Sequence, residues 1–125
     1  MPRHVEVRAA RIQVKAPQSS GLTTELAADI FRDVAAQLGF VVERRLHVST
    51  NQFVQYSARA PGKRPANKTT LILWVDNKQI IFLSSIYGYA KDLDAAQRAA
   101  ALFEQALDKR GISYKVSSWK AIIPP

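Results

Sequence analysis

The sequence contains, from Thr69 to Ile86, the stretch TTLILWVDNKQIIFLSSI, which decides the fold. Residues Thr69 to Val75 are largely apolar at both odd and even positions, as expected for a central strand that is covered on both faces. Asp76-Asn77-Lys78 is typical of a short turn, and Gln79 to Ile86 form a second run rich in Ile, Phe and Leu. Two such runs joined by a polar turn predict an antiparallel hairpin in the middle of a sheet.

The segments before this hairpin extend it into a larger sheet. Residues Gly39 to Thr50 alternate between apolar and polar side chains, with Arg44 interrupting the apolar side. Asn51-Gln52 is a turn candidate, and Phe53 to Ala60 alternate again. The run from Val41 to Ile86 therefore predicts an antiparallel meander of four strands.

Two segments have the apolar spacing of amphipathic helices. The first runs from Thr24 to Leu38, with Thr23 or Thr24 as the N-cap and Gly39 where a left-handed residue ends a helix. The second runs from about Asp92 to Arg110, followed by Gly111. The apolar residues that share one side are Leu22, Leu26, Ile30, Val34 and Leu38 in the first helix and Ala95, Ala99, Leu102, Phe103, Ala106 and Leu107 in the second.

The two ends of the chain add further strands. Val5 to Lys15 alternate, but the phase slips at Ala9-Ala10, which predicts a bulge or bend there. Ala16 to Gly21 have the composition of a loop. Ile112 to Val116 alternate as a last strand, before a short apolar tail from Trp119 to Pro125.

The order of these elements, β-α-β-β-β-β-α-β, predicts an α+β fold. We expect an antiparallel sheet of five to six strands with two helices packed on one face, formed by residues 1–125 as a single domain. The chain has no cysteine and no apolar run long enough to cross a bilayer, and its N-terminus lacks the apolar region of a secretory signal. A cytoplasmic protein that does not bind membranes is the expectation.

The positive charge lies outside the predicted helices. The chain has 18 Lys and Arg against 10 Asp and Glu, a net charge of +8. With Lys91 counted at the start of the second helix, the two helices together carry −2, so the remaining segments carry +10, with Glu6, Glu43 and Asp76 as their acidic residues. A charge of this size favours an anionic partner, which is nucleic acid or an acidic protein.

Strand alternation predicts where this charge gathers. If the helices cover one face of the sheet, the other face is left to water or to a partner and carries Arg45, His47, Gln55, Ser57, Arg59 and Lys115. The loop Pro61 to Lys68 adds Lys63, Arg64 and Lys68, in a stiff basic segment that can reach a phosphate backbone. Trp74 and Phe53 fall on positions that face outward, where an aromatic ring can stack on a base.

Motifs of catalysis, metal binding and cofactor binding are absent. The chain has no Ser-His-Asp spacing, no phosphate-binding Gly-rich loop, no paired histidines at helical spacing and no consensus of RNA-recognition sheets. We therefore expect no catalytic residue, no metal and no cofactor. His47 with Arg45 and Arg59 nevertheless keeps open a small ribonuclease, which needs an acid–base group and a cation.

The sequence leaves three functional hypotheses. The first is a non-enzymatic basic protein that binds an anionic partner, nucleic acid in the first place, through Arg45, His47, Arg59, Lys63, Arg64, Lys68, Trp74 and Lys115. The second is a protein-binding module, such as a toxin-neutralising immunity protein or a secretion chaperone, and the third is the small ribonuclease. The outward face of the sheet is also a possible homodimer interface.

Overall fold

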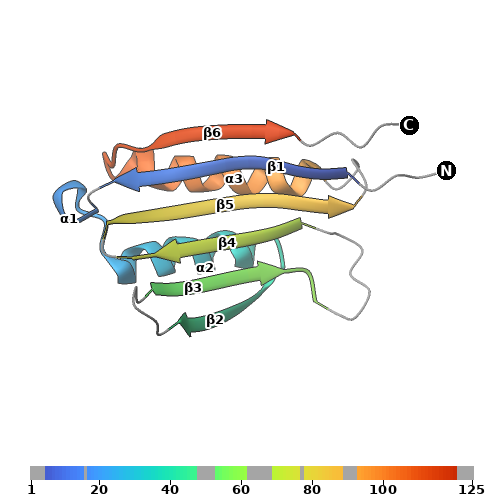
Figure 1. Ribbon diagram of the computed structural model, residues 1–125, viewed down its shortest axis with the longest axis horizontal. Coiled ribbons are helices and arrows are strands. Elements are labelled where there is room, and N and C mark those ends of the chain that lie inside the picture. Colours follow the sequence, from blue (N-terminus) through green and yellow to red (C-terminus); the bar gives the residue numbers. More distant parts are fainter. Residues whose placement is uncertain are drawn as a thin grey trace.

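A computed structural model describes residues 5–15, 17–47, 53–61, 69–76, 78–88 and 93–120 of the chain. Within these described residues, six strands and two long helices follow the predicted order of elements (Figure 1). The strands are β1 (Val5–Lys15), β2 (Val41–His47), β3 (Phe53–Arg59), β4 (Thr69–Val75), β5 (Gln79–Gly88) and β6 (Lys115–Lys120). The helices are α1 (Pro17–Ser20), α2 (Thr24–Gln37) and α3 (Leu93–Lys109).

The strands form one antiparallel sheet in the order β2-β3-β4-β5-β1-β6. The predicted four-strand meander is confirmed as β2 to β5. The N-terminal strand β1 pairs with β5, and β6 adds to the far side of β1 (Figure 1). Strands from the two ends of the chain thus lie side by side.

Strand β1 contains the predicted irregularity. Its pairing with β5 shifts between Arg8 and Ala10, at the point where the apolar phase slips. Beyond the shift, Ala10, Ile12 and Val14 are buried, whereas Lys15 is exposed. A bulge restores the match between pattern and face because a slip of one residue exchanges the two faces of a strand.

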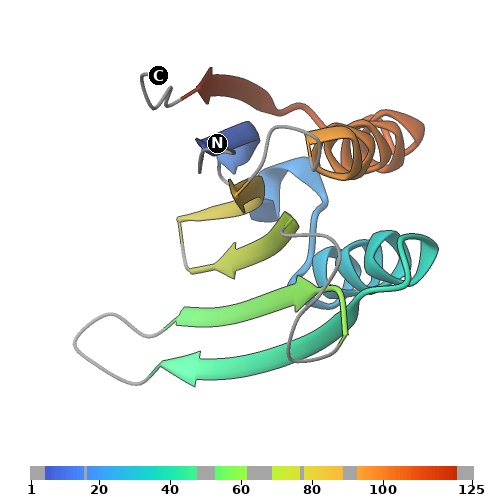
Figure 2. The same cartoon turned by 90° about the vertical axis from the view of Figure 1, so that its right-hand side faces the viewer.

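Both α2 and α3 pack on the same face of the sheet, and in the described part of the chain no helix lies on the other face (Figure 2). Three fully buried phenylalanines join the two layers: Phe103 of α3 lies 6.1 Å from the Phe31 ring of α2 and 4.9 Å from the Phe82 ring of β5, between ring centroids. Ser84 on β5 donates a hydrogen bond to the carbonyl of Ala96 in α3 at 2.5 Å. The small buried residues Ala96, Ala99 and Ala100 let this helix approach the sheet closely.

The ends of the helices use the residues that the sequence offers. Thr23 is the N-cap of α2, and its hydroxyl accepts a hydrogen bond from the Leu26 backbone N–H at 3.0 Å. Gly39, at φ 72°, allows its own N–H to bond the Ala36 carbonyl and the Phe40 N–H to bond the Ala35 carbonyl. The predicted cap Asp92 of the second helix lies outside the described residues.

Three predictions at the element ends were wrong. Pro17 to Ser20 form a short helix rather than a loop, because Pro suits a first helical position and Gly21 at φ 82° ends the turn. The last strand begins at Lys115 rather than at Ile112, because the Ile112 N–H bonds the Leu107 carbonyl as part of the C-terminal motif of α3. Trp119 belongs to β6 and not to a tail.

Candidate nucleic-acid interface

The side of the sheet away from the helices, called the open face below, has an apolar centre. On β4 the buried positions alternate with Thr70, Ile72 and Trp74, and on β5 they alternate with Ile81 and Leu83. Trp74 pairs with Ile81, and Ile72 pairs with Leu83. These four half-buried side chains form an apolar strip along the two central strands.

Trp74 is held in the strip by the turn that follows its strand. Its indole Nε1–H donates to the Asp76 carboxylate at 3.0 Å, and the same carboxylate accepts from the backbone N–H groups of Lys78 at 2.7 Å and Gln79 at 2.9 Å. Burial alone would raise the pKa of Asp76, but the hydrogen bonds from Trp74 and from the two backbone groups hold the pKa below its ordinary value. The hydrogen bond between Trp74 and Asp76 fixes the orientation of the indole ring.

A basic flank borders the strip on the side of β1 and β6. Arg11, Gln13 and Lys15 alternate with the buried residues of β1, and Lys115 pairs with Gln13 from β6. The Gln13 side chain donates a hydrogen bond to the Gln79 side chain, which links the flank to β5. Arg11 pairs with Leu83, so a cation lies one strand away from the apolar strip.

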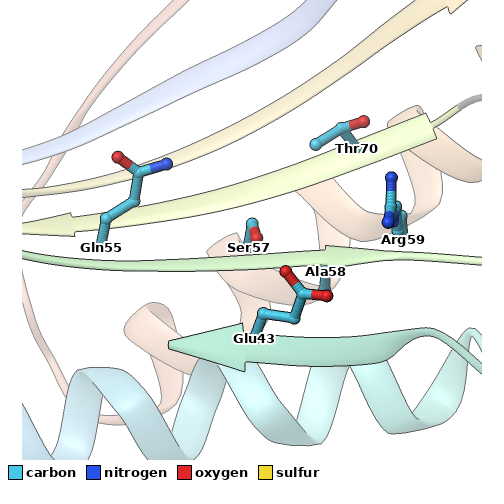
Figure 3. A pocket seen from close by; sticks show the side chains of 6 residues that line it. All are labelled: Glu43, Gln55, Ser57, Ala58, Arg59 and Thr70. Atoms are coloured by element: carbon cyan, nitrogen blue, oxygen red, sulfur yellow. The ribbon is translucent and has the colours of Figure 1, made fainter. Parts of the chain in front are cut away.

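On the opposite side, towards β2 and β3, the strip is bordered by a polar hollow of about 230 Å³. It is lined by Glu43, Gln55, Ser57, Ala58, Arg59 and Thr70, which come from three adjacent strands (Figure 3). Ser57 pairs with Glu43 on one side and with Ile72 on the other, so the hollow borders the apolar strip. It brings together one carboxylate, one guanidinium, one amide and two hydroxyls.

The described residues include three of the predicted site residues with their side chains. Arg59, Trp74 and Lys115 lie on the open face, as strand alternation predicts. The backbones of Arg45 and His47 pair with those of Gln55 and Phe53, respectively. The side chains of Arg45, His47 and Phe53 lie outside the described part of the structure. Residues Lys63, Arg64 and Lys68, with most of their predicted loop, also lie outside the described residues.

The described cations of the open face form two groups rather than one. Arg59 on β3 and Lys115 on β6 are separated by four strand spacings, or about 19 Å across the sheet. Sequence reasoning did not place Arg11 and Lys15 beside Lys115 on this face. The signal was present, because the phase slip at Ala9-Ala10 turns these two residues away from the helices.

The structure does not bring His47 and Arg59 together. His47 pairs with Phe53 at one end of the β2–β3 ladder, and Arg59 pairs with Val41 at the other end. The two pairs lie six residue steps apart along the strands, a distance of about 20 Å. With their backbones so far apart, His47 and Arg59 cannot act on the same phosphate. Arg59 is therefore removed from the ribonuclease hypothesis.

Arg44, which interrupts an apolar pattern in the sequence, lies on the helix side of β2. It is exposed, and its guanidinium lies 5.9 Å from the centre of the buried Tyr56 ring, while Arg32 of α2 lies 5.3 Å from the same ring. Both cations interact with the π face of an aromatic ring at the edge of the core. Arg44 therefore covers the core and does not contribute to the open face.

No protein-family model and no curated protein sequence matches this chain. In the described part of the chain, no helix combines the length and the apolar character that crossing a bilayer requires.

Proposed function

We propose that this protein is a non-enzymatic binding protein that engages single-stranded nucleic acid through the open face of its sheet. One observation carries the proposal: an apolar strip containing Trp74 lies between cationic residues on both sides, with Arg11, Lys15 and Lys115 on one and Arg59 on the other. Proteins that bind single strands combine cations for the phosphates with apolar and aromatic surfaces for the bases.

The arrangement fits a single strand better than a duplex. In a duplex the base faces are stacked inside, so a protein meets the phosphates and the edges of the bases. Phosphates laid over Ile72, Trp74, Ile81 and Leu83 would lose water against apolar side chains without a compensating hydrogen bond. A single strand can place its bases on the strip and its phosphates beside the flanking cations.

Fluorescence anisotropy with labelled oligonucleotides tests the proposal. We expect a single strand to bind more tightly than the matching duplex, and its Kd to rise steeply with salt because bound counterions are released. Trp74→Leu keeps the strip apolar but removes the ring, and we expect binding to weaken by roughly 5- to 100-fold, the effect of losing one stacked base. If no oligonucleotide binds at low salt, the proposal is wrong.

A second candidate is a protein-binding module for an acidic partner, such as the immunity protein or chaperone considered above. The observation that favours it is the composition of the strip, in which Ile72, Ile81 and Leu83 are aliphatic and Trp74 is aromatic. Apolar centres with polar rims are typical of protein interfaces. A complex with a single acidic protein that survives high salt, together with weak oligonucleotide binding, would favour this function.

A further inference from the structure

We infer that the open face takes an unstacked, pyrimidine-rich single strand whose backbone runs along β1. Its consecutive phosphates lie on Arg11, Lys115 and Lys15, called the phosphate track below. The inference rests on the proposed function and names the form of nucleic acid that this face binds. Strand β1 lies between β5 and β6, with β4 beyond β5, so the phosphate track borders the apolar strip along its whole length (Figure 1).

The cations of the phosphate track have no protein partner in the described part of the chain. Within those residues, no hydrogen bond or ion pair engages the side chain of Arg11, Lys15 or Lys115. Lys15 and Lys115 are exposed, and Arg11 is half-buried. Each of the three can therefore meet a phosphate without giving up an internal contact, and each phosphate that is neutralised releases counterions.

The phosphate track has a regular spacing. Alternate residues of an antiparallel strand lie about 7 Å apart on one face. Arg11 and Lys15 are separated by two such steps, with Gln13 between them. Lys115 on β6 pairs with Gln13 and so supplies the cation at the middle position. The track therefore offers one cation about every 7 Å along β1.

This spacing fits a stretched strand and not a stacked one. Bases in a duplex strand stack about 3.4 Å apart, so a stacked strand passes two phosphates for each cation of the track. If every base leaves its neighbour and packs on the protein instead, the rise per nucleotide doubles to about 7 Å and each phosphate meets one cation. Pyrimidine runs stack weakly on themselves and lose least by this change, so they are the preferred ligand.

The neighbouring strands give the bases a surface to pack on. Residues directly opposite in an antiparallel pair share a face of the sheet. The rows that lead from β1 into the apolar strip are Arg11–Leu83–Ile72 and Gln13–Ile81–Trp74. Bases attached to phosphates on β1 therefore lie over the strip. A strand laid across the sheet would instead carry phosphates over these apolar side chains, where they would lose water without a compensating hydrogen bond.

Uncharged linkages test the phosphate track. Labelled oligothymidine of about four nucleotides is compared by anisotropy with strands in which one linkage at a time is a neutral methylphosphonate. Each replacement should raise the Kd for the unmodified protein and lower the slope of log Kd against log salt by about 0.7. Arg11→Gln, Lys115→Gln and Lys15→Gln should each abolish the effect at a different linkage, with Lys115→Gln acting on the central one.

Arg98→Gln is the matched control, because Arg98 is an exposed cation of α3, on the helix side of the sheet. It should leave the effect of every linkage unchanged. A linkage effect that Arg59→Gln abolishes and the three variants of the phosphate track do not would overturn the inference, since the phosphates would then lie on the other side of the apolar strip.

Oligodeoxyadenosine of the same length tests the form of the strand, because adenines stack strongly on one another. It should bind several-fold more weakly than oligothymidine. Equal or tighter binding of oligodeoxyadenosine would overturn the unstacked form, and binding that responds to no single linkage would overturn the phosphate track; both results leave the proposed function standing. If no strand binds at low salt, whether short or long, both proposals are wrong.

Discussion

At the scale of single residues, the hydrogen bond between Trp74 and Asp76 shows what alternation does and does not predict. The sequence places Trp74 on the outward side of β4, and the structure confirms it. The carboxylate that holds its Nε1–H comes from the following turn, two residues away. Alternation specifies the face on which the Trp74 side chain lies, but its hydrogen-bond partner depends on the conformation of the turn that follows the strand.

The lowered pKa of Asp76 leads to a prediction about pH. The interactions of this carboxylate stabilise the fold fully above its ordinary pKa of 3.8 and are lost as the pH falls through the lower value of the folded state. We expect Asp76→Asn to reduce the free energy of unfolding by about 1 kcal/mol at pH 7, and by less below pH 4. Urea denaturation over this pH range measures the difference.

Lys78→Ala is the control, because Asp76 accepts a hydrogen bond from the backbone N–H of Lys78 and not from its side chain. A loss of stability in Asp76→Asn that does not change with pH would contradict the prediction.

At the scale of elements, the C-terminal ends of α2 and α3 are built alike. In α3 the Gly111 N–H bonds the Asp108 carbonyl and the Ile112 N–H bonds the Leu107 carbonyl, and Gly39 and Phe40 repeat this pattern after α2. The glycines are visible in the sequence, and their left-handed conformation was predicted for Gly39. The use of Ile112 as a buried cap residue, rather than as the start of a strand, was not predicted, since its alternation with Tyr114 and Val116 suits a strand equally well.

We predict that Gly111→Ala destabilises the protein by about 1–2 kcal/mol, the cost of placing a Cβ in the left-handed region. A Cβ at this position would meet no other atom within 4 Å, so the cost comes from the backbone conformation, at φ 67°. Gly111→Asn should lose less, because asparagine tolerates this conformation better. Thermal unfolding of the two variants gives the order; equal losses would show that the conformation is not the cause.

At the scale of the whole molecule, Phe103 joins both helices to the sheet. Its ring is fully buried between Phe31 and Phe82. We expect Phe103→Ala to lower the free energy of unfolding by about 3–5 kcal/mol, a large part of the total for a small domain. Phe103→Leu should lose clearly less because it leaves a smaller cavity. Denaturant titration of both variants checks the order, and a loss below about 1 kcal/mol for Phe103→Ala would contradict this role.

The two faces of the sheet give a prediction about charge. Lys115 is exposed on the open face, whereas Lys109 is exposed in the last turn of α3, on the helix side. Lys115→Glu and Lys109→Glu change the net charge equally. If the open face binds nucleic acid, Lys115→Glu should weaken the binding of a single strand several-fold and reduce its salt dependence, while Lys109→Glu has little effect. Equal effects of the two variants in anisotropy measurements would show that the attraction depends on net charge alone.

Much of the fold was predictable because its signals are local. The β1 shift, the central hairpin and the two helices follow from the spacing of apolar residues within each segment. The candidate site was predictable in part: Arg59, Trp74 and Lys115 were assigned to the correct face. Their distance from one another was not, because it depends on the lateral order of the strands.

The sequence by itself determined the order of the elements, the face on which Arg59, Trp74 and Lys115 lie, and the concentration of net positive charge in the segments outside the helices. The tertiary structure decided which of these side chains are neighbours. It placed β1 between β5 and β6, which brings Arg11 and Lys115 to one side of the apolar strip, and it placed Glu43 beside Ser57 in the polar hollow. The physical reason is that alternation acts within a strand, whereas pairing joins segments far apart in the chain through backbone hydrogen bonds that carry little sequence information.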